Sequence, residues 1–346
     1  MHAMQTEAIT HLGARMMRKN YTTITFLFSM AAIAAMALQT GCARSHSDAK
    51  RRIAFTSILP QKDFVQRIAG DRFEIFALVG PGQSPHSYTP TPDQMARLSE
   101  AAVFFRIGVE FEESLVKKIT KAMPGIRVVD LRKGVILREM LEEHHHDGEE
   151  DGYGDGEHDE HADHDAGRQH DGGEHHHAQT HAGKDPHIWL SPRIVKQMGA
   201  TIRDALIAAD PQGAETYEQN LVLFHRGLDS LDAYLRRTLS PLKGTPLFVF
   251  HPAFGYFADE YGLVQIAVET GGKEPSARAL ARLIEQARKH KPKVIFVQPQ
   301  YARKSAEALA KQIGCAVVSI NPLPENYFDE MREMCRAVQS GLGIDE

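Results

Sequence analysis

The chain has 346 residues, of which 42% are hydrophobic, and its formal net charge is −5 at pH 7. This length exceeds one ordinary domain and predicts two globular halves with appended segments, and the hydrophobic fraction suffices for packed cores. The mild negative charge excludes nucleic acid as the main partner, because nucleic-acid-binding proteins concentrate positive charge. The 19 histidines are unevenly distributed, and their placement is the first indication of function.

The first 42 residues have the pattern of an export signal. Arg15, Arg18 and Lys19 precede an uncharged apolar stretch over residues 21–38, and small residues then lead to Cys42. A transmembrane anchor is the alternative, because a stretch of this length nearly spans a bilayer. The small residues and the cysteine favour the signal, so we expect an exported protein, in the periplasm or at the outer face of the cytoplasmic membrane.

The residues before Cys42 bear on how the signal is processed. The sequence Leu-Gln-Thr-Gly-Cys resembles the lipobox of bacterial lipoproteins, whose cysteine is acylated after cleavage. It departs from that pattern at Gln39, where leucine is usual. Anchoring to the membrane by a lipid on Cys42 and plain cleavage into a soluble protein therefore both stay open. Residues 43–50 are the expected polar tether.

Residues 51–190 predict a first α/β lobe. Strands are expected at 52–57, 73–79, 103–107 and 127–129, and helices between them at 61–69, 91–98 and 112–121. Thr91, Pro92 and Gln94 have the pattern of a capping box, which begins a helix. Strands that alternate with helices indicate a parallel sheet with helical crossovers.

Within this lobe, residues 142–184 form a segment that we call the His-rich insertion. It is dominated by His, Asp, Glu and Gly, and it holds 11 of the 19 histidines. These are His144, His145, His146, His158, His161, His164, His170, His175, His176, His177 and His181. Such a composition cannot bury a hydrophobic core, so we expect a disordered loop.

Residues 191–240 predict a helical connection. One helix is expected over 193–209, and a longer one begins at Asp210-Pro211 and runs to about 239. Its hydrophobic residues recur every three or four positions as Tyr217, Leu221, Phe224, Leu228, Leu231 and Leu235. This spacing indicates one buried stripe. At 1.5 Å per residue the helix would span about 40 Å, enough to join two lobes rigidly.

Residues 241–346 repeat the α/β pattern. Strands are expected at 247–250, 263–268, 294–297 and 316–320, with helices ending at 261 and lying over 280–287, 302–313 and 326–338. The predicted fold class is therefore α/β, with two lobes of parallel-type sheets flanked by helices and joined by one long rigid helix.

Three histidines outside the His-rich insertion lie at expected strand ends. His86 follows the strand at 73–79, His187 lies in Asp-Pro-His-Ile-Trp, and His251 directly follows the strand at 247–250. Each has a proline or glycine nearby, which fixes the backbone that presents the imidazole. Ligand sites of α/β sheets gather at strand ends. Recurrence in both lobes favours a shared metal site over three ordinary loop histidines.

Several motifs resemble those of the zinc and manganese substrate-binding proteins of ABC importers, the family of high-affinity zinc-uptake proteins and lipoprotein adhesins. The motifs are PHSYTPTP, DPHIWLSP, HPAFGYFADEYGL, ETGGKEPSARAL, VIFVQPQ and SINPLPENYFDEM, and the resemblance covers residues 51–341. It implies a monomeric transport protein rather than an enzyme. Such a protein captures a metal ion in a cleft between its lobes and delivers it to a membrane permease.

The resemblance also implies a set of ligands. It makes His86, His187 and His251 the metal ligands, and we call them the histidine triad. The family's fourth ligand is commonly an aspartate in Asp-Pro-Leu, where this chain has Asn321. The fourth position therefore falls to water, to the amide oxygen of Asn321, or to a carboxylate such as Glu269.

Ligand chemistry favours zinc at this site. Three imidazoles suit a tetrahedral Zn²⁺, whereas Mn²⁺ prefers oxygen ligands. Manganese-selective relatives typically have glutamate where this chain has His251. A manganese-binding homologue is the alternative.

The His-rich insertion has a separate expected role. Imidazoles and carboxylates in one flexible segment bind zinc weakly and raise its concentration near the main site. Capture should fade as the pH falls through about 6.5, because imidazole binds metal only when it is unprotonated. A merely solubilising segment is the alternative.

Other possibilities stay open on sequence grounds. Cys315 and Cys335 form either one disulfide or two free thiols. Three histidines and a water also describe a zinc hydrolase, but the chain has no His-Glu-x-x-His motif. A surface adhesin or storage protein would depend on the His-rich insertion alone.

Overall fold

The computed structural model describes residues 51–140, 183–268, 289–301 and 303–343, together with positions 281, 284, 285 and 287. Met1–Lys50 forms a separate unit from Arg51–Glu346, and the description below concerns the second unit. The expected export signal with Cys42, the tether and the His-rich insertion up to residue 182 lie outside the described residues. Within the described ranges, every helix is too short or too polar to cross a membrane.

The first sheet has four parallel strands in the order β2-β1-β3-β4. In chain order they are β1 (Arg52–Thr56), β2 (Phe73–Ala77), β3 (Val103–Arg106) and β4 (Arg127–Asp130). The connecting helices are α2 (Leu59–Ala69), α3 (Pro92–Leu98) and α4 (Glu112–Ala122). α3 begins as predicted, because Thr91 and Gln94 form a reciprocal capping box.

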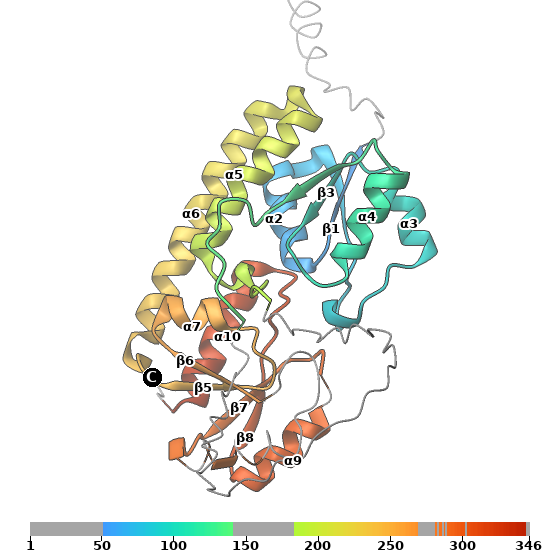
Figure 1. Cartoon of the computed structure of the whole chain (residues 1–346). Helices are drawn as coiled ribbons and strands as arrows, with labels where there is room; N and C mark the ends of the chain where they lie inside the picture. The colour runs from blue at the N-terminus through green and yellow to red at the C-terminus, as the bar shows by residue number, and fades with distance from the viewer. Residues whose placement is uncertain are drawn as a thin grey trace, which may run out of the picture. The chain divides into compact units, whose positions relative to one another are not determined.

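The second sheet repeats this topology with the strand order β6-β5-β7-β8 (Figure 1). Its strands are β5 (Pro246–Val249), β6 (Val264–Ala267), β7 (Val294–Val297) and β8 (Ala316–Ser319). The described helices of this part are α7 (Gly255–Tyr261), α9 (Arg303–Ile313) and α10 (Tyr327–Gly341).

The central strand β7 of the second sheet is buried on both faces. In β7, Val294 and Phe296 belong to a core cluster that also contains the residues of the first sheet. Ile295 and Val297 face the other way and pack in a second cluster with Leu309 of α9. Successive side chains of a strand point to opposite faces of the sheet. The uninterrupted hydrophobic run Val-Ile-Phe-Val therefore fits a parallel sheet that is covered on both faces.

A long helix packs beside both sheets. α5 (Pro192–Ala209) and α6 (Ala214–Leu239) contact each other, and α6 also contacts α2, α7 and α10 at different points along its length (Figure 1). The six hydrophobic residues predicted to form its stripe are all buried. Its 26 residues fit the expected long helix, which begins after a 3₁₀ turn at Pro211–Gly213 rather than at Asp210.

The α/β class with two parallel sheets is therefore confirmed. Most predicted elements agree with the structure to within a few residues at their ends, as is usual for helix and strand limits. The predicted helix over 280–287 lies mostly outside the described residues. The rigidity of α6 and the domain boundaries stay predictions.

The two described cysteines are not paired. Cys315 and Cys335 are free thiols in the structure, so the disulfide left open by the sequence is not formed. Cys335 is buried on α10 in the core shared by both sheets, whereas Cys315 packs against the second cluster. Burial raises the pKa of the Cys335 thiol to about 12, so this thiol stays protonated at neutral pH.

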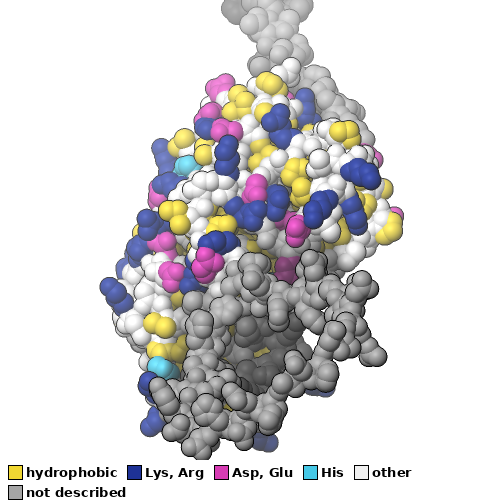
Figure 2. Space-filling view, viewed as in Figure 1, with side chains coloured by type: hydrophobic (Ala, Val, Ile, Leu, Met, Phe, Trp, Pro, Cys, Tyr) yellow, Lys and Arg dark blue, Asp and Glu magenta, His cyan; other side chains and the backbone are white. Residues whose placement is uncertain are grey.

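Charged side chains of both signs are mixed on the visible surface. Figure 2 shows Lys and Arg among Asp and Glu over much of the described face. Some form ion pairs along α5 and α6, such as Lys196 with Asp229 at 2.6 Å and Arg203 with Glu218 at 2.9 Å. Pairs of this kind add little stability. The core and a few buried charges must therefore decide the stability of the fold.

One of these buried charges, Asp210, joins the first sheet to the start of α6. Asp210 is fully buried, and its Oδ2 accepts hydrogen bonds from Arg72 Nε (2.6 Å) and Tyr217 Oη (2.6 Å). Arg52 forms an ion pair with Oδ1 at 3.0 Å. Burial alone would raise the pKa of Asp210, but these hydrogen bonds and charges outweigh it and lower the pKa below its ordinary value of 3.8.

We expect Asp210→Asn to lower the free energy of unfolding at pH 7 by about 2 kcal/mol, since it leaves two partly exposed guanidinium groups without their counter-charge. A carboxylate with a lowered pKa stabilises the fold above its unfolded-state pKa. The parent should therefore lose this contribution as the pH falls through the folded-state pKa, and the variant should not. Urea unfolding at several pH values measures both. Asp229→Asn, which alters an exposed pair, is the control; equal stability of Asp210→Asn and the parent would contradict the prediction.

Candidate metal centre

His86 is presented by the loop between β2 and α3. It lies in the 3₁₀ turn Pro85–Ser87, where Ser84 Oγ accepts a hydrogen bond from His86 N at 3.3 Å. The loop continues to Tyr88, whose hydroxyl donates to Gln94 Oε1 in the capping box of α3 at 2.6 Å. The backbone around His86 is thus fixed at both ends.

A carboxylate faces the outer nitrogen of His86. Glu110 Oε1 lies 3.4 Å from His86 Nδ1. Glu110 belongs to the loop after β3, which is held by the buried Glu112: its two carboxylate oxygens accept from Ile107 N at 2.8 Å and Gly108 N at 2.6 Å. Since a carboxylate only accepts, this contact favours a proton on Nδ1 and leaves the lone pair on Nε2.

His187 is oriented by a buried carboxylate two residues earlier. Asp185 Oδ1 accepts from His187 N (2.9 Å) and from His187 Nδ1 (2.8 Å). Both residues are nearly inaccessible to solvent. Because the carboxylate accepts from Nδ1, the Nε2 of the neutral imidazole carries a free lone pair, as in metal-bound histidines supported by a carboxylate.

His251 directly follows β5 and is held by Gln298 at the end of β7. Its N–H donates to Gln298 Oε1 (3.1 Å), and Gln298 Nε2 donates back to His251 O (2.8 Å). Its ring stacks on Tyr301, with 4.9 Å between centroids and an interplanar angle of 24°. Two side chains from the neighbouring strand and its following loop therefore fix both the backbone and the imidazole plane.

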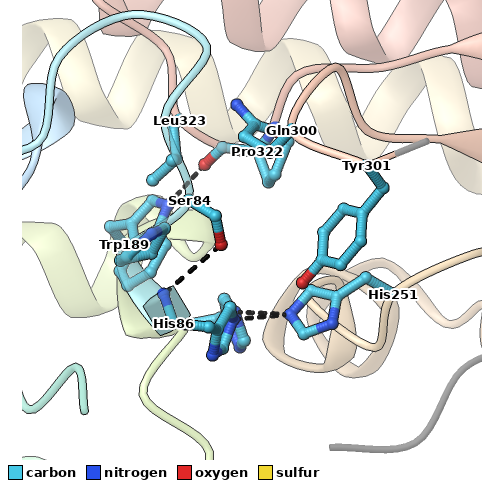
Figure 3. A pocket seen from close by; sticks show the side chains of 10 residues that line it. Ser84, His86, Trp189, His251, Gln300, Tyr301, Pro322 and Leu323 are labelled. Atoms are coloured by element: carbon cyan, nitrogen blue, oxygen red, sulfur yellow. Dashed lines mark hydrogen bonds between the residues drawn. The ribbon is translucent and has the colours of Figure 1, made fainter. Parts of the chain in front are cut away.

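The three imidazoles meet at one point. His251 Nε2 lies 3.0 Å from His86 Nε2 and 3.4 Å from His187 Nε2. In Figure 3 the His86 and His251 rings point toward one another, with Tyr301 alongside. Ligand nitrogens of a tetrahedral ion with bonds of about 2.0–2.1 Å lie roughly 3.3–3.4 Å apart. A single proton on His251 Nε2 could not form two good hydrogen bonds, to His86 Nε2 and His187 Nε2 at once. One cation between the rings could accept the lone pairs of all three nitrogens.

The histidine triad lines a small pocket that opens to the surface. Its volume of about 20 Å³ has room for one water-sized occupant or a single ion. Besides the triad, the lining residues are Ser84, Pro85, Trp189, Gln300, Tyr301, Pro322 and Leu323. Within the described parts of the chain, the triad is the one group of His, Cys, Asp or Glu whose ligand atoms gather closely, all within 4.8 Å. No carboxylate belongs to this described lining, so the donors are neutral.

The chain before the His-rich insertion pairs with the chain at its end, next to Asp185. Glu139 and Lys184 form an antiparallel bridge and an ion pair, and Asp185 N donates to Arg138 O at 3.0 Å. Arg138 also donates to Asp185 Oδ2 at 3.3 Å. Tyr256 Oη donates to Asp185 O at 3.0 Å. Burial raises the pKa of Tyr256 to about 12, so its hydroxyl keeps this proton at neutral pH.

The other predicted ligands do not join the triad in the described structure. Asn321 does not line the cavity, because its amide forms hydrogen bonds with Gln300, Leu323 and Glu330. Glu269, like the 11 histidines of the insertion, lies outside the described residues. The role of the triad as ligands stays a prediction.

Sequence reasoning missed three residues around the site. Asp185 is part of the motif Asp-Pro-His-Ile-Trp, and its position two residues before His187 could have indicated that it orients this histidine. Glu110 and Gln300 gave no such signal, because their places depend on contacts with His86 and Asn321 that are distant in sequence.

Comparison with known proteins gives the family. The sequence profile described as "ZnuA: Zinc-uptake complex component A periplasmic" matches residues 55–341. The chain belongs to this family. The expected resemblance is thereby confirmed, over nearly the same residues as the motifs indicated.

Individual members of the ZnuA family and its relatives are similar over most of the chain. The high-affinity zinc uptake system protein ZnuA of Bacillus subtilis is 31% identical over 301 residues, which are 83% of this chain and 86% of that protein. The zinc-binding lipoprotein AdcA of Streptococcus pneumoniae strain R6 is 30% identical over 323 residues, 90% of this chain but 59% of AdcA. The solved structure of a 138-173 ZnuA deletion mutant plus zinc bound is 31% identical, covers 86% of this chain and 100% of that one, and has a TM-score of 0.70.

We expect Asp185→Ala to weaken divalent-metal binding about 10- to 100-fold, the usual effect of losing a carboxylate that supports a histidine ligand. Without Asp185 the ring of His187 can rotate and its proton can move to Nε2. Titration with Co²⁺, followed by its visible spectrum, measures the change. Asp259→Ala is the matched control, because Asp259 is the exposed partner of the same Arg138. Unchanged Co²⁺ affinity in Asp185→Ala would refute the positioning role.

Proposed function

We propose that this chain captures Zn²⁺ outside the cytoplasm with His86, His187 and His251 and delivers it to the permease of an ABC-type importer. The observation that carries the proposal is that three imidazole nitrogens lie close together in one small pocket. Membership of the zinc-uptake family supports it, as do the zinc-binding names of the relatives. In this proposal zinc is the cargo of the protein.

The neutral donor set supports zinc over manganese. Three imidazoles suit Zn²⁺ and leave one tetrahedral position open, whereas Mn²⁺ favours carboxylate and other oxygen ligands. Asn321 could bind the ion only by giving up hydrogen bonds to Gln300 and Leu323. We therefore propose water as the fourth ligand, with Glu269 as the alternative to be tested.

Transport is also favoured over hydrolysis. A zinc hydrolase needs a general base that activates the metal-bound water. The described lining of the cavity has no carboxylate, and it admits little more than the ion and one water. Such a site suits the capture of a bare ion better than the turnover of an organic substrate.

The remaining parts of the chain complete the proposal. The first 42 residues direct export, and Cys42 carries a lipid that anchors a monomer at the outer face of the membrane; the lipoprotein name of AdcA supports this. The His-rich insertion binds zinc weakly and raises its local concentration. Because Glu139 and Lys184 pair beside Asp185, the chain leaves for the insertion and returns from it near His187.

His251→Ala should abolish the single tight zinc site, because two imidazoles cannot hold a tetrahedral ion as three do. Calorimetric titration of the mature chain, with Mn²⁺ as competitor, measures this. The control is His290→Ala, which removes an exposed histidine whose ring lies tilted beside Phe248, away from the triad. A tight site that is lost in His251→Ala and indifferent to Mn²⁺ supports the proposal. If His251→Ala bound zinc as tightly as the parent, the tight site would lie elsewhere in the chain and the proposal would be wrong.

Deleting residues 142–182 should remove several weak zinc sites and leave one tight site intact. A short linker should replace them, so that the pairing of Glu139 with Lys184 and of Arg138 with Asp185 is kept. Zinc stoichiometry and affinity before and after deletion are the measurement. In the parent, the weak sites should disappear as the pH falls below about 6.5. Loss of all tight binding on deletion would favour storage or adhesion over import.

A further inference from the structure

Trp189 joins the turn that follows His187 to the segment after β8. It lies in the 3₁₀ turn Ile188–Leu190 and is fully buried. Its indole Nε1–H donates to Pro322 O at 2.6 Å (Figure 3), and its own carbonyl oxygen accepts from Tyr327 Oη at 2.8 Å. An indole N–H only donates and a carbonyl only accepts, so the direction of both bonds is fixed. Both the side chain and the backbone of Trp189 are therefore held.

The indole ring of Trp189 lies beside the imidazole of His187. Their ring centroids are 5.1 Å apart, with an interplanar angle of 56°. Both residues line the pocket of the histidine triad. Asp185 accepts from Nδ1 of the same imidazole at 2.8 Å and thereby sets which nitrogen carries the proton. The indole adds a second constraint, because its bulk limits where the imidazole ring can lie.

The supports of Trp189 and of His251 are attached to neighbouring strands. β7 and β8 pair in parallel, and Ile320, directly after β8, donates its N–H to the last carbonyl of β7 at 2.9 Å. Gln298, the residue after β7, forms the two hydrogen bonds with the backbone of His251. Pro322, which holds the indole, follows Ile320 by two residues. One pair of strands thus carries a support of each histidine.

We propose that Trp189 and Tyr327 are positioning residues for zinc capture: together they hold the imidazole of His187 at the distance from the imidazole of His251 that one ion requires. The inference rests on the proposed function and adds to it two residues that are not metal ligands. The two Nε2 atoms lie 3.4 Å apart, which fits two ligands of one tetrahedral ion. Metal sites keep their geometry to within about 0.5 Å only where packing and hydrogen bonds lock the supporting side chains.

Tyr327 acts on His187 through the backbone of Trp189. It is fully buried at the start of α10 and is not among the described residues that line the pocket. Without its hydroxyl the carbonyl of Trp189 loses this donor, and a buried acceptor left without a partner is destabilising. The turn then shifts toward another donor, and the imidazole two residues earlier shifts with it.

The test is Tyr327→Phe in the full mature chain, which removes one hydroxyl and keeps the ring. We expect zinc affinity, measured by competition against a chromophoric chelator, to fall about tenfold, the lower end of the effect of losing a group that supports a ligand. The visible spectrum of the Co²⁺-loaded variant should also shift. Tyr217→Phe is the matched control, because Tyr217 is equally buried and its hydroxyl donates to Asp210 instead. Both variants should lower the melting temperature, but only Tyr327→Phe should change the affinity and the spectrum.

The outcomes separate this inference from the proposed function. If Tyr327→Phe kept the zinc affinity and Co²⁺ spectrum of the parent, as Tyr217→Phe should, the inference alone would be overturned and Tyr327 would serve only the core. If the parent itself bound no zinc tightly, the proposed function would fail and this inference with it. If Tyr327→Phe does not fold, Trp189→Phe takes its place, since it keeps a ring beside His187 but removes the donor to Pro322. Weaker zinc binding with a shifted Co²⁺ spectrum supports the inference, and parent-like values overturn it.

Discussion

A buried carboxylate holds the parts of the site together. Asp185 is inaccessible to solvent, and a charge in that position is tolerated only when it is paired and hydrogen-bonded. Its partners are the backbone and ring of His187 on one oxygen and Arg138 on the other. Gly255 at the start of α7 is part of the same constraint, because any side chain there would collide with the Arg138 guanidinium. One charge thus fixes His187, the segments that flank the His-rich insertion and the helix after His251.

The second requirement is a common core. His86 and His187 are carried by segments connected to the first sheet, and His251 follows a strand of the second. Their Nε2 separations of 3.0 and 3.4 Å would not survive relative movement of the sheets by even a few ångströms. One core cluster contains residues of both sheets, and α6 packs against helices on either side. Close packing of this kind resists deformation, so it keeps the three imidazoles of the triad in place.

The charges around the cavity are arranged in two layers. The inner donors are neutral imidazoles, and the carboxylates of Asp185 and Glu110 stand behind two of them. A divalent ion is therefore compensated through the rings rather than by direct contact. This arrangement raises the basicity of the ligand nitrogens without adding a hard oxygen ligand. It would suit the proposed capture of zinc in preference to manganese.

The sequence alone determined the features that depend on residues close together in the chain. The two parallel sheets, the capping box at Thr91, the buried stripe of α6 and the three histidines at strand ends all follow from residues within a turn or two of each other. The tertiary structure decided the rest. It brought together His86 and His251, 165 positions apart, and turned Asn321 toward Gln300 rather than into the cavity. Periodicity and capping act along the chain, whereas the partner of a polar side chain is set by which distant segments pack against it, and no local pattern encodes that choice.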